Sequence, residues 1–225
     1  MTGTGLRSLH EPLGERGSLL LQGEAVHQNV CIFGDSIAAG VGDHTGGGWA
    51  ERVRHWSAQS LPLHPKVMNL GVPGDRLEDL LDRFERECAS RSPIALIIAT
   101  GINDSHDLPE GPRTGEERFT TMFIDLLERA RTVTSRLLVL GPTNVTDGHP
   151  AHNFDNRSIL RYQAIEQATT VARGIPFVPL HGVIPDSSLA EDGLHPDASG
   201  HEIIYESILP TWRSLWAPNP SGTFP

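Results

Sequence analysis

Cysteine and long apolar runs are both scarce in this chain of 225 residues. Its two cysteines, Cys31 in an apolar strand-like run and Cys88 on an apolar helical face, are too few for a disulfide framework or a cysteine metal site. We expect both to be reduced core residues, as is usual in the cytoplasm. No run approaches the roughly 18 apolar residues of a membrane helix, and the N-terminal patch 19–21 is too short for a signal peptide core. The sequence therefore predicts a cytoplasmic protein without a membrane span.

Positive charge is also in short supply. The chain has 18 Lys and Arg against 28 Asp and Glu, a net charge of −10, and its basic residues are scattered. Binding to nucleic acid relies on a concentrated positive surface that neutralises phosphates, so we expect no nucleic-acid partner. The length fits one domain. The sequence does not indicate an oligomeric state.

Short apolar runs alternate with longer segments of helical period, a pattern typical of βαβ units. Strands are expected at 29–33, 66–70, 94–100, 137–140 and 176–179. Helices are expected at about 49–59, 77–88, 119–130, 154–173 and 196–212, with Pro196 in the first turn of the last helix and Pro210 bending or ending it. These elements predict a three-layer α/β/α domain with a five-stranded parallel sheet. The domain should span 29–216, between an N-terminal tail or extension at 1–28 and a flexible tail at 217–225.

Four polar turns follow the predicted strands or precede the last helix, at 34–37, 69–74, 101–104 and 191–196. In an open parallel sheet, ligands bind beyond the carboxyl ends of the strands. A serine, an asparagine, two glycines, a histidine and an acid from four distant segments can therefore converge at one edge.

Together these residues supply the parts needed for acyl transfer. Ser36 is the predicted nucleophile, and His195 is the base that activates it and later protonates the leaving oxygen. Asp192, three residues before the histidine, is placed to orient its ring. The predicted oxyanion donors are the backbone N–H groups of Ser36 and Gly71 and the side-chain amide of Asn103. Glycine at position 71 permits a close approach of the backbone.

The four turns resemble the sequence blocks of the SGNH hydrolase superfamily, the GDSL-type esterases and lipases. Gly34-Asp35-Ser36-Ile37 is similar to the first block, and the blocks that contain Gly71, Asn103 and His195 follow in the family's order over about 29–215. The resemblance implies a flavodoxin-like sheet and hydrolysis of carboxylic esters, with Ser36, Gly71, Asn103 and His195 as the defining residues and no cofactor. Ile37 stands where the family has leucine, a swap that conserves volume.

Several of these residues also have simpler interpretations. Ser36 suits a helix N-cap, Asn103 and Asp104 suit a turn that closes a strand, and Gly71 and Gly74 suit the turn alone. His195 suits the cap of the last helix.

Two further assignments stay open or are set aside. The acid that orients His195 could also be Asp186 or Asp197. The close pair His149 and His152 is interrupted by Pro150 and has no third ligand in the sequence, so we expect a solvated loop rather than a metal site.

The leading hypothesis is a serine esterase that acts on a small-molecule ester. We expect a preference for short acyl chains, because the loops at 105–114 and 143–153 are modest in length and carry no obvious apolar lid. A lysophospholipase, a thioesterase and a carbohydrate deacetylase would use the same machinery. Two alternatives belong to other functional classes. One is a metal-dependent phosphoesterase, which would bind its metal through ligands that hard ions prefer, and the other is a non-catalytic module that binds an ester or carbohydrate. The candidate ligands of the phosphoesterase are Asp35, Asn103, Asp104, Asp192 and His195.

Overall fold

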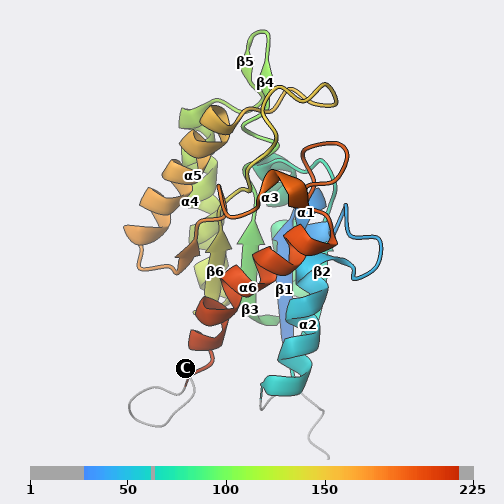
Figure 1. Cartoon of the computed structure of the whole chain (residues 1–225). Helices are drawn as coiled ribbons and strands as arrows, with labels where there is room; N and C mark the ends of the chain where they lie inside the picture. The colour runs from blue at the N-terminus through green and yellow to red at the C-terminus, as the bar shows by residue number, and fades with distance from the viewer. Residues whose placement is uncertain (1–27, 62–63, 218–225) are drawn as a thin grey trace, which may run out of the picture.

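Five parallel strands form the centre of the computed structural model, which describes residues 28–61 and 64–217 (Figure 1). They are β1 (Asn29–Gly34), β2 (Lys66–Gly71), β3 (Pro93–Ala99), β6 (Leu137–Leu140) and β7 (Phe177–Val178). Their order in the sheet is β2-β1-β3-β6-β7, and every pair is parallel. This confirms the predicted fold class, with the strand order of flavodoxin-like sheets. Apart from Gln28 and Ala217, the predicted N-terminal extension and C-terminal tail lie outside the described residues.

Helices cover both faces of the sheet (Figure 1). One face carries α2 (Gly48–Ser60) and α6 (Ala198–Ser214), and the other carries α3 (Leu77–Arg91) and α4 (Glu116–Val133). α5 (Asn156–Val171) packs against α4 and β7. Short elements complete the described chain: α1 (Ser36–Ala39), the hairpin of β4 (Asp107–Leu108) and β5 (Gly111–Pro112), and the 3-10 helix η1 (Asp186–Ser188).

The central strands are buried because both of their faces are covered. Alternate residues of β1 enter different cores: Val30 and Ile32 pack with α2 and α6, whereas Cys31 and Phe33 pack with α3 and α4. Cys31 and Cys88 are free and buried, as predicted. Burial raises the pKa of the Cys31 thiol to about 12, so this side chain is an unreactive core residue.

The last helix differs from its prediction at both ends. It starts at Ala198 rather than at Pro196, because the Asp197 side chain caps it by accepting the N–H groups of Ser199 and Gly200. It also continues past Pro210 to Ser214, so Pro210, which was expected to bend or end the helix, does not end it. Trp212 explains the continuation, since it is fully buried and its Nε1 donates to Ser57 Oγ at 3.0 Å. This packing outweighs the backbone hydrogen bond that proline removes.

Local chemistry also shortens two other predicted elements. α5 begins at Asn156 rather than at 154, because the Asp155 side chain caps it by accepting the N–H of Ser158. β7 has only two residues, since Pro176 and Pro179 flank it and proline cannot donate to the ladder. Among the residues that the structure describes, no helix is long and apolar enough to cross a membrane.

A carboxyl group without a partner lies inside the domain, on α5. Glu166 is fully buried, and neither of its side-chain oxygens has a hydrogen-bond partner among the described residues. A Cβ atom on Gly101, in the turn after β3, would lie 2.9 Å from Glu166 Oε1. Burial, together with Asp104 and Asp35, raises the pKa of Glu166 well above its usual range. The folded protein therefore holds this side chain as a neutral acid.

We expect Glu166→Gln to stabilise the protein at neutral pH. In the unfolded chain a glutamate ionises near pH 4.5, whereas the folded protein keeps Glu166 protonated. Above that pH, stability falls by up to about 1.4 kcal/mol per pH unit until the pKa of the folded state is reached. The neutral amide removes this loss, so the melting temperature at pH 7 to 8 should rise by about 2 to 4 °C for each kcal/mol regained.

The control for this variant is Glu206→Gln, at an exposed position of α6. The melting temperature, measured from pH 4 to 9, should depend on pH in the same way for Glu206→Gln and the wild type. Only for Glu166→Gln should this dependence become weaker. A Glu166→Gln variant that is destabilised at every pH would contradict a neutral Glu166.

Candidate active site

The predicted turns meet beyond the carboxyl ends of β1, β2 and β3. β1 and β3 are neighbours in the sheet, although β2 lies between them in the sequence and is placed on the other side of β1. The strand order therefore reverses between β1 and β3. Connections leave toward opposite faces at such a point and open a crevice between them. The turn 34–37 follows β1, and the turn 101–104 follows β3.

Ser36 is the first residue of α1, immediately after β1. The cap of this helix is Asp35, whose side chain accepts the N–H of Ile37 at 2.9 Å, so the capping role considered for Ser36 belongs to its neighbour. Burial raises the pKa of Asp35 to about 7, and the hydrogen bond from Ile37 opposes this rise. The carboxyl group of Asp35 is thus committed to shaping the turn that presents Ser36.

The ring of His195 connects Ser36 to Asp192. Its Nε2 lies 2.9 Å from Ser36 Oγ, and its Nδ1 lies 2.6 Å from Asp192 Oδ2. Asp192 Oδ1 accepts the N–H groups of Leu194 and His195. Burial acts to raise the pKa of Asp192, but these hydrogen bonds hold it at about 2. An ionised carboxylate requires Nδ1–H to donate, which leaves Nε2 free to accept the Ser36 proton.

The other two acidic candidates have different surroundings. Asp197 caps α6 with its side chain, and Asp186 begins η1. Of the three candidates, Asp192 is the residue whose carboxylate contacts His195.

Two histidines predicted to lie in a solvated loop, His149 and His152, hold the turn between Asp192 and His195. His152 Nδ1 accepts the N–H of Phe154, so its Nε2 carries the hydrogen and donates to the Gly193 carbonyl at 3.2 Å. The same carbonyl accepts the N–H of Thr146 at 2.8 Å. The His149 ring lies so close to Gly193 that a Cβ there would be 2.9 Å from its Cγ. Both rings are half-buried, whereas residues 147, 148, 150, 151 and 153 around them are exposed, so the segment is a solvated loop as predicted, and its two histidines also hold the neighbouring turn. Their close spacing was the only sign of this role in the sequence.

Asn103 and Asp104 have different roles in the turn after β3. Asn103 Nδ2 donates to the Asp75 carbonyl at 3.0 Å, which aims the amide toward the turn after β2 and leaves its second hydrogen available. Asp104 Oδ2 accepts the N–H of Leu77 at the start of α3, so Asp104 is structural.

Gly71 allows a close backbone approach but does not offer a free N–H. It ends β2, and a Cβ there would lie 2.5 Å from the backbone nitrogen of Ala39 in α1. However, the Gly71 N–H already donates to Asn69 Oδ1 at 3.0 Å. The Gly71 N–H, the predicted oxyanion donor, is thus engaged within its own turn.

Gly74 carries the one backbone N–H between Gly71 and Leu77 for which the described residues supply no acceptor. The other donors are accounted for: Val72 donates to Gly34 O, Asp75 to Val72 O and Arg76 to Asp79 Oδ2, while Pro73 has no N–H. Gly74 is exposed and has a φ of 86°, the left-handed conformation at the third position of a turn. The Pro-Gly pair in the sequence is the signal that indicates this turn.

The metal ligands of the phosphoesterase hypothesis are not gathered into a site. Within 28–61 and 64–217, no group of three or more His, Cys, Asp or Glu side chains is arranged to hold a metal ion. Asp35 and Asp104 each use a carboxylate oxygen to accept a backbone N–H.

Comparison with known proteins places the chain in a family. Residues 32–203 match the GDSL-like Lipase/Acylhydrolase family. The chain is 25% identical to Esterase TesA of Pseudomonas aeruginosa over 200 residues, covering 88% of this chain and 94% of TesA. It is 28% identical to GDSL lipase Rv0518 of Mycobacterium tuberculosis over 193 residues, 80% of each protein.

The fold agrees with this assignment. The lipase/acylhydrolase from Enterococcus faecalis superposes with a TM-score of 0.71 at 24% identity, over 83% of this chain and 96% of that structure. The chain therefore belongs to the GDSL-like lipase/acylhydrolase family, whose members are hydrolases that act on ester bonds.

Proposed function

We propose that this protein is a serine esterase that hydrolyses carboxylic esters with short acyl groups through an acyl-Ser36 intermediate. The observation that carries the proposal is the row of hydrogen bonds from Ser36 Oγ through the His195 ring to the Asp192 carboxylate, at 2.9 and 2.6 Å. Such a row joins a nucleophile, a base and the group that orients the base.

Each of the three side chains has a defined task in this mechanism. Ser36 Oγ attacks the ester carbonyl while His195 Nε2 takes its proton, and Asp192 stabilises the imidazolium that forms. As the tetrahedral intermediate collapses, His195 gives this proton to the leaving alcohol, and the acyl group stays on Ser36. Water then attacks the acyl-enzyme, with His195 again as the base, and releases the acid and free Ser36.

The negative charge that develops on the carbonyl oxygen needs preorganised donors. We assign this role to the Ser36 N–H, to the Asn103 amide and to the Gly74 N–H in place of that of Gly71. Two observations support the reassignment: the Gly71 N–H is engaged by Asn69, and Gly74 directly precedes the residue whose carbonyl orients Asn103.

Two exposed valines beside the nucleophile favour a short acyl group. Val41 donates its N–H to the Ser36 carbonyl, and Val72 donates its N–H to the Gly34 carbonyl, so both lie next to the turn that carries Ser36. These two residues are 38% and 40% exposed. They offer a small apolar surface for an acyl chain. Lysophospholipase, thioesterase and carbohydrate deacetylase activities stay alternatives on the same machinery, and the cytoplasmic location stays a prediction.

We expect Ser36→Ala to abolish turnover without unfolding the protein, because it removes the nucleophile and leaves the surrounding hydrogen bonds of α1 in place. The measurement is a series of p-nitrophenyl esters from acetate to palmitate. Wild-type activity should be highest for the shortest acyl chains. Ser90→Ala, at an exposed position of α3, is the control and should behave as the wild type. Turnover by Ser36→Ala would remove Ser36 from the mechanism, and a palmitate optimum would replace the short-chain assignment.

We expect Asn103→Ala to lower kcat by about 100- to 1,000-fold, the usual loss for one oxyanion donor. KM should change little, because the amide acts mainly on the transition state. Steady-state kinetics on the best ester measure both constants, with Asn153→Ala, in an exposed loop, as the control. An effect confined to KM would demote Asn103 to substrate positioning.

Replacing single peptide bonds by esters distinguishes Gly74 from Gly71 as a donor. We expect an ester in place of the Gly74 N–H to lower kcat by at least about tenfold, because a donor to the oxyanion is lost. The same change at Gly71 should leave kcat within about twofold and lower the melting temperature, because it removes the bond to Asn69. The opposite pattern would restore the assignment to Gly71.

A further inference from the structure

We propose that Arg83, on α3, is a positioning residue that sets the geometry of the oxyanion donors. This inference rests on the proposed function, since it concerns the donors named there. Arg83 lies behind the turns after β1 and β2, and its guanidinium group contacts both of them.

The contacts of Arg83 form a planar fork. Its Nε lies 2.8 Å from Asp75 Oδ2, its Nη2 donates to the Gly34 carbonyl at 3.3 Å, and its Nη1 lies 3.3 Å from Glu87 Oε1. The Cζ atom lies 5.5 Å from the centre of the Phe33 ring. Only 12% of the side chain is exposed. The guanidinium is therefore held in one orientation, and a lysine ammonium cannot reproduce this set of contacts.

Two of these contacts reach the segments that supply the donors. Gly34 ends β1, two residues before Ser36, so the bond to its carbonyl fixes the backbone that leads to the Ser36 N–H. Asp75 directly follows Gly74, and its carbonyl accepts the Asn103 amide at 3.0 Å. One guanidinium thus connects the positions of all three proposed donors, which come from three different turns.

Asp75 makes this arrangement dependent on Arg83. Its side chain is only 13% exposed. Burial raises the pKa of Asp75, and the hydrogen bond and charge of Arg83 act in the opposite direction. Without Arg83, the mostly buried Asp75 carboxylate would lose the guanidinium that it binds. An unpaired buried charge is unfavourable, so the turn after β2 would rearrange. Because Asp75 holds Asn103 through its own carbonyl, such a rearrangement would displace the Asn103 amide.

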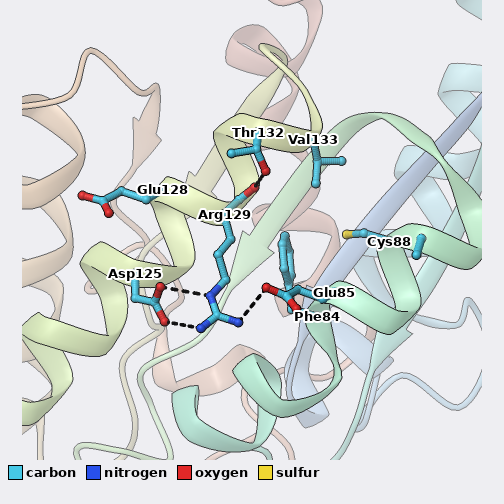
Figure 2. A pocket seen from close by; sticks show the side chains of 9 residues that line it. Phe84, Glu85, Cys88, Asp125, Glu128, Arg129, Thr132 and Val133 are labelled. Carbon is cyan, nitrogen blue, oxygen red and sulfur yellow. Dashed lines mark hydrogen bonds and ion pairs between the residues drawn. The ribbon is translucent and has the colours of Figure 1, made fainter.

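A second arginine on the same side of the sheet provides a matched control. Arg129 of α4 also has a forked set of contacts: its Nε and Nη2 bind Asp125 at 3.0 and 2.7 Å, and its Nη1 binds Glu85 of α3 at 2.9 Å (Figure 2). It lines a groove between α3 and α4 with Phe84 and Cys88 (Figure 2). These contacts involve no residue of the catalytic turns. Arg129→Ala therefore shows how kcat responds when an arginine that joins only two helices is lost.

The experiment compares Arg83→Ala, Arg83→Lys, Asp75→Asn and Arg129→Ala on one short-chain ester, with melting temperatures recorded for each. We expect Arg83→Ala to lower kcat by about 10- to 100-fold with KM within about twofold, the scale of a misplacement near 1 Å. Arg83→Lys should recover only part of the loss, and Arg129→Ala should keep the wild-type kcat. Guanidinium chloride at low millimolar concentration should raise kcat of Arg83→Ala but not that of Asn103→Ala.

Asp75→Asn keeps the test decisive if Arg83→Ala does not fold, because it removes the ion pair and preserves the shape of the side chain. It should lower kcat as well. The proposal is overturned if folded Arg83 or Asp75 variants keep the wild-type kcat or change only KM, or if Arg129→Ala loses as much kcat as Arg83→Ala. An active Ser36→Ala variant would instead refute the serine mechanism itself, so the two failures can be told apart.

Discussion

The imidazole of His195 binds Ser36 Oγ, 159 positions earlier in the chain, with one ring nitrogen and Asp192 of its own loop with the other. The ring keeps this position because the loop that carries it is held from outside. The Gly193 carbonyl accepts hydrogen bonds from Thr146 and His152, which belong to the segment after β6. In addition, a Cβ on Gly42 would lie 2.1 Å from the Pro196 carbonyl, so the segment after α1 packs directly on this loop.

Close backbone contacts bring the remaining parts of the site together. A Cβ on Gly34 would lie 2.5 Å from the Ala99 carbonyl, and one on Gly71 would lie 2.5 Å from the Ala39 nitrogen. The ends of β1, β2 and β3 can therefore approach one another more closely than side chains would permit. Three carboxyl groups are buried in this part of the domain. Asp35 and Asp104 each accept a backbone N–H, whereas Glu166 has no hydrogen-bond partner among the described residues and is held neutral.

Much of the fold and part of the candidate site could be predicted from local patterns. The apolar runs located all five strands of the sheet, and the stripes that include Phe84 and Phe123 located the helix faces that are buried. Ser36, Asn103 and His195 could be placed because each follows or precedes an element with a clear period. The hydrogen bond of the Gly71 N–H could not be predicted, because its acceptor is a side chain in the same turn. Whether the last helix would end at Pro210 could not be read from local patterns, because the burial of Trp212 outweighs the local effect of the proline.

The sequence by itself determined the succession of strands and helices along the chain, the residue types at the strand ends and the chemistry that these residues allow. These features depend on periodicity and on the properties of single side chains. Only the tertiary structure decided which of three aspartates contacts His195, and which groups hold the turns in place. It also decided for which glycine N–H of the turn after β2 the described part of the chain supplies no acceptor. Those choices depend on distances between segments that are remote in the chain. The contact between Arg83 and the Gly34 carbonyl, across 49 positions, leaves no periodic trace in the sequence. It exists because the parallel sheet places α3 behind the ends of β1 and β2.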